Sequence, residues 1–285
     1  KSAVIASPRL VTITFEGDSN TADVQAAGDA LVVSDWVKTV GADYGVGDGT
    51  HLAKAVLPGP APAKLTESDL LAAVDQQIAA GQIPSPKSDI IYMIYIPGAT
   101  DFDDGMGYHM CSDYLGYHWQ ADVPTGTLTY AIVGDCTDFS ELTATLAPEY
   151  IETASDPGET GGYFLQVAKT DPWISQAGLE NADLCDYADY VTEGAYTYQR
   201  VWSNSAAAAA VTSPCAPIDP EEIFYDVYAD PAPVPKVAAG QSATFTLTGW
   251  STAPVPDWAL SWDADYYSEF KPGVELSAAT INNGK

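Results

Sequence analysis

Hydrophobic and polar positions follow two different periods along the first half of the chain. Residues 11–15 alternate with β-branched side chains and predict a strand, whereas residues 23–40 carry apolar side chains at helical spacing. A second helix is predicted from a capping pattern at Thr66 and the apolar positions that follow it, closing near Gly81. The continuous apolar run 89–96 is typical of a strand buried on both faces of a sheet.

Further segments complete the pattern of this first region. Residues 52–57 and 128–133 predict two more strands, and residues 138–155 predict a helix that Pro148 interrupts. Strands and helices that alternate in this way predict an α/β domain with helices packed on a central mixed sheet. Residues 196–210 add one further strand or helix.

The pattern changes near residue 214, where three prolines predict a stiff linker. Beyond it, residues 224–228, 243–248 and 258–262 alternate as strands. We therefore expect an α/β domain over residues 1–217 and a β-sandwich module of the immunoglobulin-like kind over residues 218–285. The module is short for its class, so we expect it to be incomplete at residue 285.

The net charge of the chain indicates which classes of binding partner are disfavoured. The chain has 39 acidic and 11 basic residues, a formal net charge of −28. Such a surface repels phosphate backbones and anionic lipids, which argues against nucleic-acid and membrane-surface binding. No run of 18 apolar residues exists, so the sequence predicts no membrane span. A salt-adapted surface and a set of calcium sites both remain compatible with this charge.

The four cysteines point to an oxidising compartment. They are even in number and none lies in a Cys-x-x-Cys pair, which favours disulfides over a zinc knuckle. Four cysteines allow three pairings, of which the sequential one is simplest: Cys111–Cys136 and Cys185–Cys215. We therefore expect a secreted or cell-surface protein.

Carboxylates form the densest candidate site. Glu149, Glu152 and Asp156 are spaced to lie along one helix face, and Glu180 and Asp183 follow in a segment next to Cys185. This arrangement predicts a cation site, with a solvated acidic surface as the alternative. Among three histidines, His118 is either a structural residue near Cys111 or a further member of this site.

These residues resemble a motif of a family of secreted bacterial proteins similar to plant EXORDIUM-like (phosphate-induced) proteins. The family pattern reads Ser-His-Glu-x-x-Glu-Ala-x-Thr-Asp-Pro, followed downstream by Glu-x-x-Asp-x-Cys. Glu149, Glu152 and Asp156 match its first part, and Glu180, Asp183 and Cys185 match its second part. The resemblance covers roughly residues 8–217.

The resemblance implies a zincin-like domain in which Glu149 is the general base and Glu152 and Glu180 are metal ligands. The position of the first ligand, a histidine, is occupied by Pro148. We therefore expect Glu149 to be vestigial and the protein to be an extracellular structural or binding protein, with calcium at Glu152, Glu180, Asp183 and Asp156. Its expected partner is an extracellular protein or polysaccharide.

Two alternatives remain open. One is an active secreted metal-dependent hydrolase, a peptidase, that holds zinc through a non-standard ligand set including His118. The other is a self-assembling subunit of an extracellular assembly.

Overall fold

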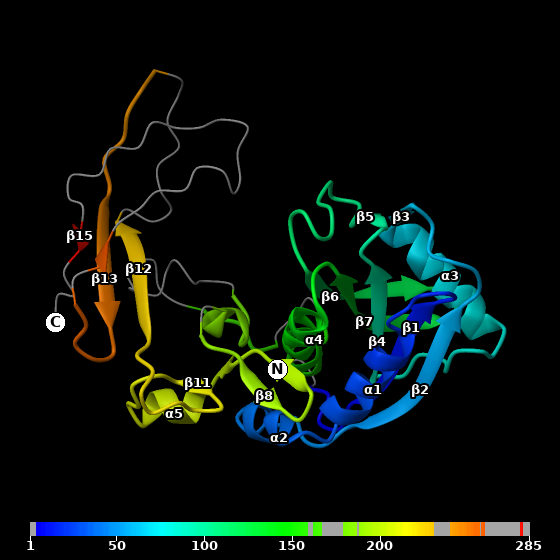
Figure 1. Ribbon diagram of the computed structural model, residues 1–285, viewed down its shortest axis with the longest axis horizontal. Helices are drawn as coiled ribbons and strands as arrows, with labels where there is room; N and C mark the ends of the chain where they lie inside the picture. Colours follow the sequence, from blue (N-terminus) through cyan, green and yellow to red (C-terminus); the bar gives the residue numbers. More distant parts are fainter. Residues whose placement is uncertain are drawn as a thin grey trace. The chain divides into compact units, whose positions relative to one another are not determined.

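A computed structural model describes residues 4–158, 162–166, 179–186, 188–230, 240–256, 258–259 and 280–281. The chain divides into two compact units (Figure 1). The first comprises Lys1–Phe164, Leu179–Ser205 and Cys215–Pro217, and the second comprises Leu165–Gly178, Ala206–Pro214 and Ile218–Lys285.

A five-stranded sheet forms the centre of the first unit. Its strands are, in spatial order, β2 (Thr50–Leu57), β1 (Arg9–Phe15), β4 (Ile90–Pro97), β7 (Gly126–Asp135) and β6 (Gly116–Val123). The first four are parallel, and β6 runs antiparallel to β7 at one edge. The predicted central mixed sheet is confirmed.

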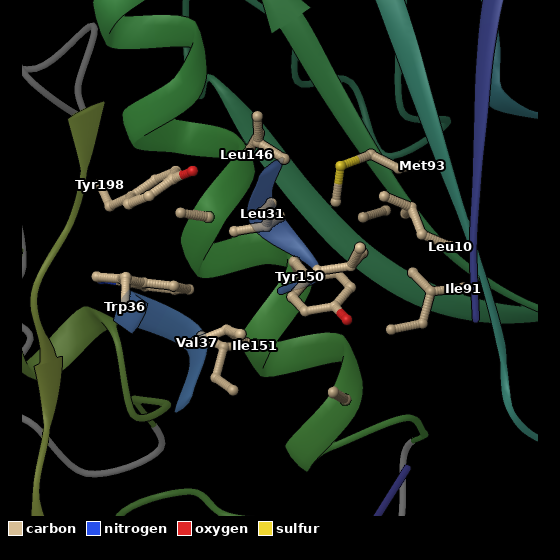
Figure 2. Close-up of a cluster of buried hydrophobic side chains, with 14 of the residues drawn as sticks. Leu10, Leu31, Trp36, Val37, Ile91, Met93, Leu146, Tyr150, Ile151 and Tyr198 are labelled. Carbon is tan, nitrogen blue, oxygen red and sulfur yellow. The ribbon is translucent and has the colours of Figure 1, made fainter. Parts of the chain in front are cut away.

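Helices cover both faces of this sheet (Figure 1). Helices α1 (Thr21–Leu31), α2 (Asp35–Gly41) and α4 (Phe139–Ser155) pack on one face, and α3 (Glu67–Ala79) packs on the other. Because alternate residues of a strand point to opposite faces, Ile91 and Met93 join the first core and Tyr92 and Ile94 join the second. Figure 2 shows Tyr150 and Leu146 of α4 in the first core, with Met93 and Ile91 of β4 nearby.

The single helix predicted over residues 23–40 is wrong, because the chain forms α1 and α2 with a break between them. Ser34 caps α2 by accepting a hydrogen bond from the Val37 amide at 2.9 Å. The Glu193 carboxylate accepts the Asp35 and Trp36 amides, each at 2.9 Å. These contacts satisfy the free amides at the start of α2, so a second helix begins although the apolar spacing continues.

The interruption predicted at Pro148 is also wrong, since α4 is continuous from Phe139 to Ser155 with Pro148 inside it. Proline has no amide hydrogen to donate to the carbonyl one turn earlier. The loss is offset by burial, because Leu146, Tyr150 and Ile151 are fully buried around this point. Pro148 is thus a buried residue of a single helix.

Short elements complete the first unit and the segment that follows it. They are β3 (Lys64–Thr66) paired with β5 (Asp101–Asp103), the 3-10 helix η2 (Asp183–Cys185), β8 (Val191–Glu193) paired with β9 (Tyr196–Tyr198), β10 (Val201–Trp202) paired with β11 (Cys215–Ala216), and α5 (Asn204–Ala208). The segment 196–210, expected to be one strand or helix, therefore holds three short elements.

The second unit contains antiparallel strand pairs. Strand β12 (Tyr225–Asp230) pairs with β13 (Thr246–Ser251), and β14 (Trp258–Ala259) pairs with β15 (Thr280–Ile281). The rings of Phe224 and Trp250 pack 5.7 Å apart beside the first pair. Residues 260–262 of the third predicted strand lie outside the described residues.

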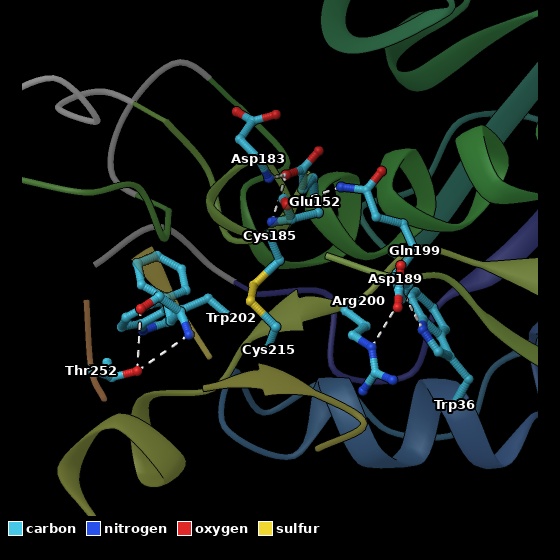
Figure 3. The surroundings of a disulfide bond; sticks show 12 residues. Trp36, Glu152, Asp183, Cys185, Asp189, Gln199, Arg200, Trp202, Cys215 and Thr252 are labelled. Carbon is cyan, nitrogen blue, oxygen red and sulfur yellow. Dashed lines mark hydrogen bonds between the residues drawn. A yellow bond between two sulfur atoms is a disulfide. The ribbon is translucent and has the colours of Figure 1, made fainter. Parts of the chain in front are cut away.

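Two disulfides, Cys111–Cys136 and Cys185–Cys215, lie within the first unit and have the sequential pairing. The first joins the segment before β6 to the segment between β7 and α4. The second joins η2 to β11 (Figure 3). Within the described part of the chain, no helix combines the length and the apolar character needed to span a bilayer.

His51 joins three elements of the first unit. Its Nε2 lies 2.8 Å from Thr12 Oγ1 of β1, and its Nδ1 lies 2.8 Å from Asp29 Oδ1 of α1. Its side chain is only 5% exposed. Burial therefore lowers the pKa of His51, although Asp29 opposes part of this effect.

We predict that replacing His51 with Gln flattens the dependence of stability on pH. Because the folded-state pKa of His51 is lowered, its contribution to stability is complete above its ordinary pKa near 6.5 and is lost as the pH falls below it. Between pH 7 and pH 5 the wild type should lose on the order of 1 kcal/mol more unfolding free energy than the variant. Urea denaturation measures this, and parallel losses in the two proteins would contradict the prediction.

Candidate metal centre

Three side chains from separate segments converge beside α4. They are His118 of β6, Glu152 of α4 and Glu180, which precedes η2. Each offers one ligand atom, and these atoms all lie within 4.8 Å of one another. The described part of the chain contains no other such group of histidine, cysteine and carboxylate side chains.

The edge strand β6 places His118 against α4. A Cβ atom at Gly116 would lie 3.0 Å from both Glu149 Oε1 and Thr145 Cγ2, so the backbone of the strand runs close to the helix. Because side chains alternate along a strand, His118 shares the face of Gly116, whereas Tyr117 points to the other face. There the Tyr117 hydroxyl donates to Glu67 Oε1 at 3.0 Å.

Helix α4 contributes two carboxylates from positions one turn apart. Glu149 Oε2 lies 3.5 Å from His118 Nδ1, and Glu180 Oε1 lies 3.4 Å from His118 Nε2. Glu152 is 4% exposed, and its Oε1 accepts the Ala182 amide at 2.9 Å and the Asp183 amide at 3.4 Å. A carboxylate has two oxygens, so Glu152 can satisfy these amides with one and offer the other to a cation.

The centre concentrates buried negative charge. Burial raises the pKa of Glu152 well above its ordinary value, and neighbouring carboxylates raise it further. Burial also raises the pKa of Glu149, while the contact with His118 opposes that change. Burial alone would lower the pKa of His118, but the Glu149 and Glu180 carboxylates outweigh it and raise this pKa well above its ordinary value. The site therefore favours positive charge, supplied either by an imidazolium or by a metal ion.

The predicted site residues divide into two sets in the structure. Glu152, Glu180 and His118 form the triad, with Glu149 in contact with His118. The two aspartates contact backbone amides instead: Asp156 Oδ1 accepts from Gly162 at 3.1 Å, and Asp183 Oδ2 accepts from Glu180 at 3.0 Å. Burial raises the pKa of both aspartates.

Several residues that support the centre lie outside the acidic pattern of the sequence. Asn181 Nδ2 donates to Ser155 Oγ at 2.8 Å, and Gln199 Nε2 donates to the Ala182 carbonyl at 2.9 Å. All three of these polar side chains are buried. Nothing in their local sequence marks them, because their partners are distant in the chain.

The donor set fits a divalent transition metal. Imidazole nitrogen and carboxylate oxygen are both ligands of zinc, and three protein ligands leave the fourth tetrahedral position open. Calcium instead takes six to eight oxygen ligands. His118 is therefore the residue that makes the triad resemble a zinc site more than a calcium site.

No protein-family model, curated protein or solved structure matches the chain. A proposed function therefore rests on the geometry of the first unit and of its candidate metal centre.

We predict that Glu152→Gln stabilises the metal-free protein. The raised pKa of Glu152 means that its contribution to stability is complete below its ordinary pKa near 4.5 and is lost as the pH rises. Glutamine keeps an oxygen for the two amides and removes the ionisable group. After treatment with a chelator, urea denaturation at pH 7 should show a gain on the order of 1 kcal/mol or more.

The control for this variant is Glu141→Gln in the first turn of the same helix, which we expect to change stability little. A Glu152→Gln protein that is less stable than the wild type at every pH from 5 to 8 would show that the carboxylate is not destabilised by its burial.

Proposed function

We propose that the protein is an extracellular binding protein that holds one divalent transition metal in a catalytically degenerate, zincin-like domain. The observation that carries this proposal is the convergence of His118, Glu152 and Glu180. Two disulfides support an oxidising, extracellular location. The motif resemblance to secreted bacterial and EXORDIUM-like proteins supports the same assignment.

Three features support the zincin-like part of the proposal. Helix α4 presents Glu149 and Glu152 one turn apart, the central sheet is mixed, and the antiparallel edge strand β6 lies beside the helix. In the second unit, the pairs β12–β13 and β14–β15 support the proposed immunoglobulin-like module. The partner we propose is an extracellular protein or polysaccharide.

A structural role for the metal follows from where its ligands lie. Glu152 is on a helix, His118 is on an edge strand, and Glu180 is in the segment that the Cys185–Cys215 disulfide holds. A cation bound to all three would join these segments and would also neutralise the buried carboxylates. Because the unfolded chain has no assembled site, the free energy of binding stabilises the fold.

We predict that the chelator-treated protein binds one equivalent of zinc and that binding raises its melting temperature. The matching histidine variants are His118→Asn in the triad and His109→Asn, which changes a half-buried histidine outside the triad, with its Nδ1 2.6 Å from Asp101 Oδ1. Calorimetric titration should show loss of binding in the first and in Glu180→Gln, and wild-type binding in the second. At 100 times the dissociation constant, zinc should add about 2.7 kcal/mol to the unfolding free energy.

Calcium is the competing ion and is tested in parallel, against sodium chloride at matched ionic strength. A rise in melting temperature with calcium and none with zinc would identify a calcium site. Equal rises in calcium and sodium chloride, with no zinc binding, would reduce the effect to charge screening and overturn the proposal.

A metal-dependent hydrolase is the second candidate, and the position of Glu149 favours it. His118 brings the number of protein ligands to three, although Pro148 removes the histidine expected on α4. A bound zinc ion supplies Lewis acidity for hydrolysis. Glu149 lies beside the triad, and burial raises the pKa of its carboxyl above the ordinary value, which is the direction of shift that suits a general base.

We predict no peptide cleavage by the zinc-loaded wild type, because the contact with His118 holds the Glu149 carboxylate on the ligand. The assay uses a broad peptide library and detects cleavage by mass spectrometry. Cleavage that Glu149→Gln abolishes and Glu141→Gln preserves would establish the hydrolase instead of the binding protein.

A further inference from the structure

Two consecutive peptide groups that follow Glu180 are held in place by hydrogen bonds to their carbonyls. The Asn181 carbonyl accepts the Trp202 amide at 2.8 Å, and the Ala182 carbonyl accepts Gln199 Nε2 at 2.9 Å. The two amides that bind Glu152 belong to these same peptide groups. A trans peptide is planar, with its carbonyl and its N–H on opposite sides. Holding each carbonyl therefore aims the Ala182 and Asp183 N–H groups at Glu152 Oε1.

Among the described residues, Gln199 is the one side chain that donates to either of these carbonyls; the Ala182 carbonyl also accepts the Cys185 amide at 2.9 Å. Gln199 is itself fixed to the core. It is buried, and its backbone carbonyl accepts Trp36 Nε1 at 2.8 Å. The Trp36 ring is buried and packs 5.3 Å from the Tyr198 ring. Figure 3 shows Gln199 between Trp36 and the Glu152–Asp183 group. Gln199 thus connects the buried Trp36–Tyr198 pair, through its backbone, to the Ala182–Asp183 peptide, through its side chain.

We propose that Gln199 is a positioning residue of the metal centre. Its contact causes Glu152 to bind the cation through one carboxylate oxygen only. By orienting the Ala182–Asp183 peptide, Gln199 keeps the Asp183 amide on Glu152 Oε1 beside the Ala182 amide, and so leaves the other oxygen for the cation. Glu180 lies two residues before Ala182, so the same contact also holds the segment that presents Glu180 to His118. This inference rests on the proposed binding of a cation at the triad. Contacts that orient metal ligands typically change affinity by a factor of 10 to 100 when removed.

The test compares cobalt binding to the full-length wild type and to Gln199→Met, which keeps the length of the side chain and removes its donor. Cobalt(II) is the probe because its visible spectrum reports the number and geometry of its ligands. We expect roughly 10-fold to 100-fold weaker binding in the variant. We also expect a changed spectrum, because loss of the Asp183 amide contact would change how the Glu152 carboxylate is oriented beside the metal. A change in stability alone would not alter the spectrum at saturating cobalt.

The matched control is Thr143→Val on α4, the helix that also carries Glu152. It removes a hydrogen bond from the Thr197 amide to Thr143 Oγ1, 3.0 Å long, without touching residues 180–183. We expect this variant to keep the wild-type affinity and spectrum even where its melting temperature falls.

Gln199→Glu is a second variant of the same size, and it decides the question if Gln199→Met does not fold. Its added negative charge would by itself strengthen cation binding, so weaker binding with a changed spectrum supports the positioning role. Wild-type or tighter binding with an unchanged spectrum in the folded variants overturns that role. In that case, loss of cobalt binding in Glu180→Gln would still support the cation site at the triad. A wild type that binds no cobalt overturns the cation site, and the role of Gln199 with it.

Discussion

The burial of carboxylates beneath an edge strand is the constraint on which the first unit depends. Glu152 is almost completely buried, and Glu149 and Glu180 lie within reach of the same imidazole. A buried charge is costly unless it is paired. The backbone amides of Ala182 and Asp183, His118 of β6 and a bound cation can together meet this requirement. The fold around α4 is therefore also the arrangement that brings the counter-charges to Glu152.

Because α4 is continuous, Pro148 does not interrupt the helix that carries the carboxylates. In the motif that the sequence resembles, its position holds the first metal ligand, and proline removes that ligand. The structure brings His118 from β6 to the same carboxylates, so the number of ligands no longer argues against a transition metal. In the proposed site, the residue on which catalysis would depend is Glu149, and its carboxylate lies 3.5 Å from His118 Nδ1.

Local patterns in the sequence predict the parts of the fold that local interactions determine. The apolar run of β4 and the Thr66 cap of α3 lie where they are expected, because a continuous apolar run and a first-turn hydrogen bond are both encoded by neighbouring residues. The break between α1 and α2 depends on Glu193, which is 158 positions from Asp35 along the chain. The roles of His118 and Gln199 likewise depend on contacts between distant segments, so the sequence suggests the carboxylates but not how they are held.

Anomalous diffraction at the zinc absorption edge shows directly whether His118, Glu152 and Glu180 bind one metal ion. In crystals of the zinc-loaded protein, we expect one strong anomalous peak within ~2.2 Å of an imidazole nitrogen of His118 and of carboxylate oxygens of Glu152 and Glu180. An anomalous map without a peak at this position, from crystals in which all three side chains are ordered, would show that the triad does not hold zinc.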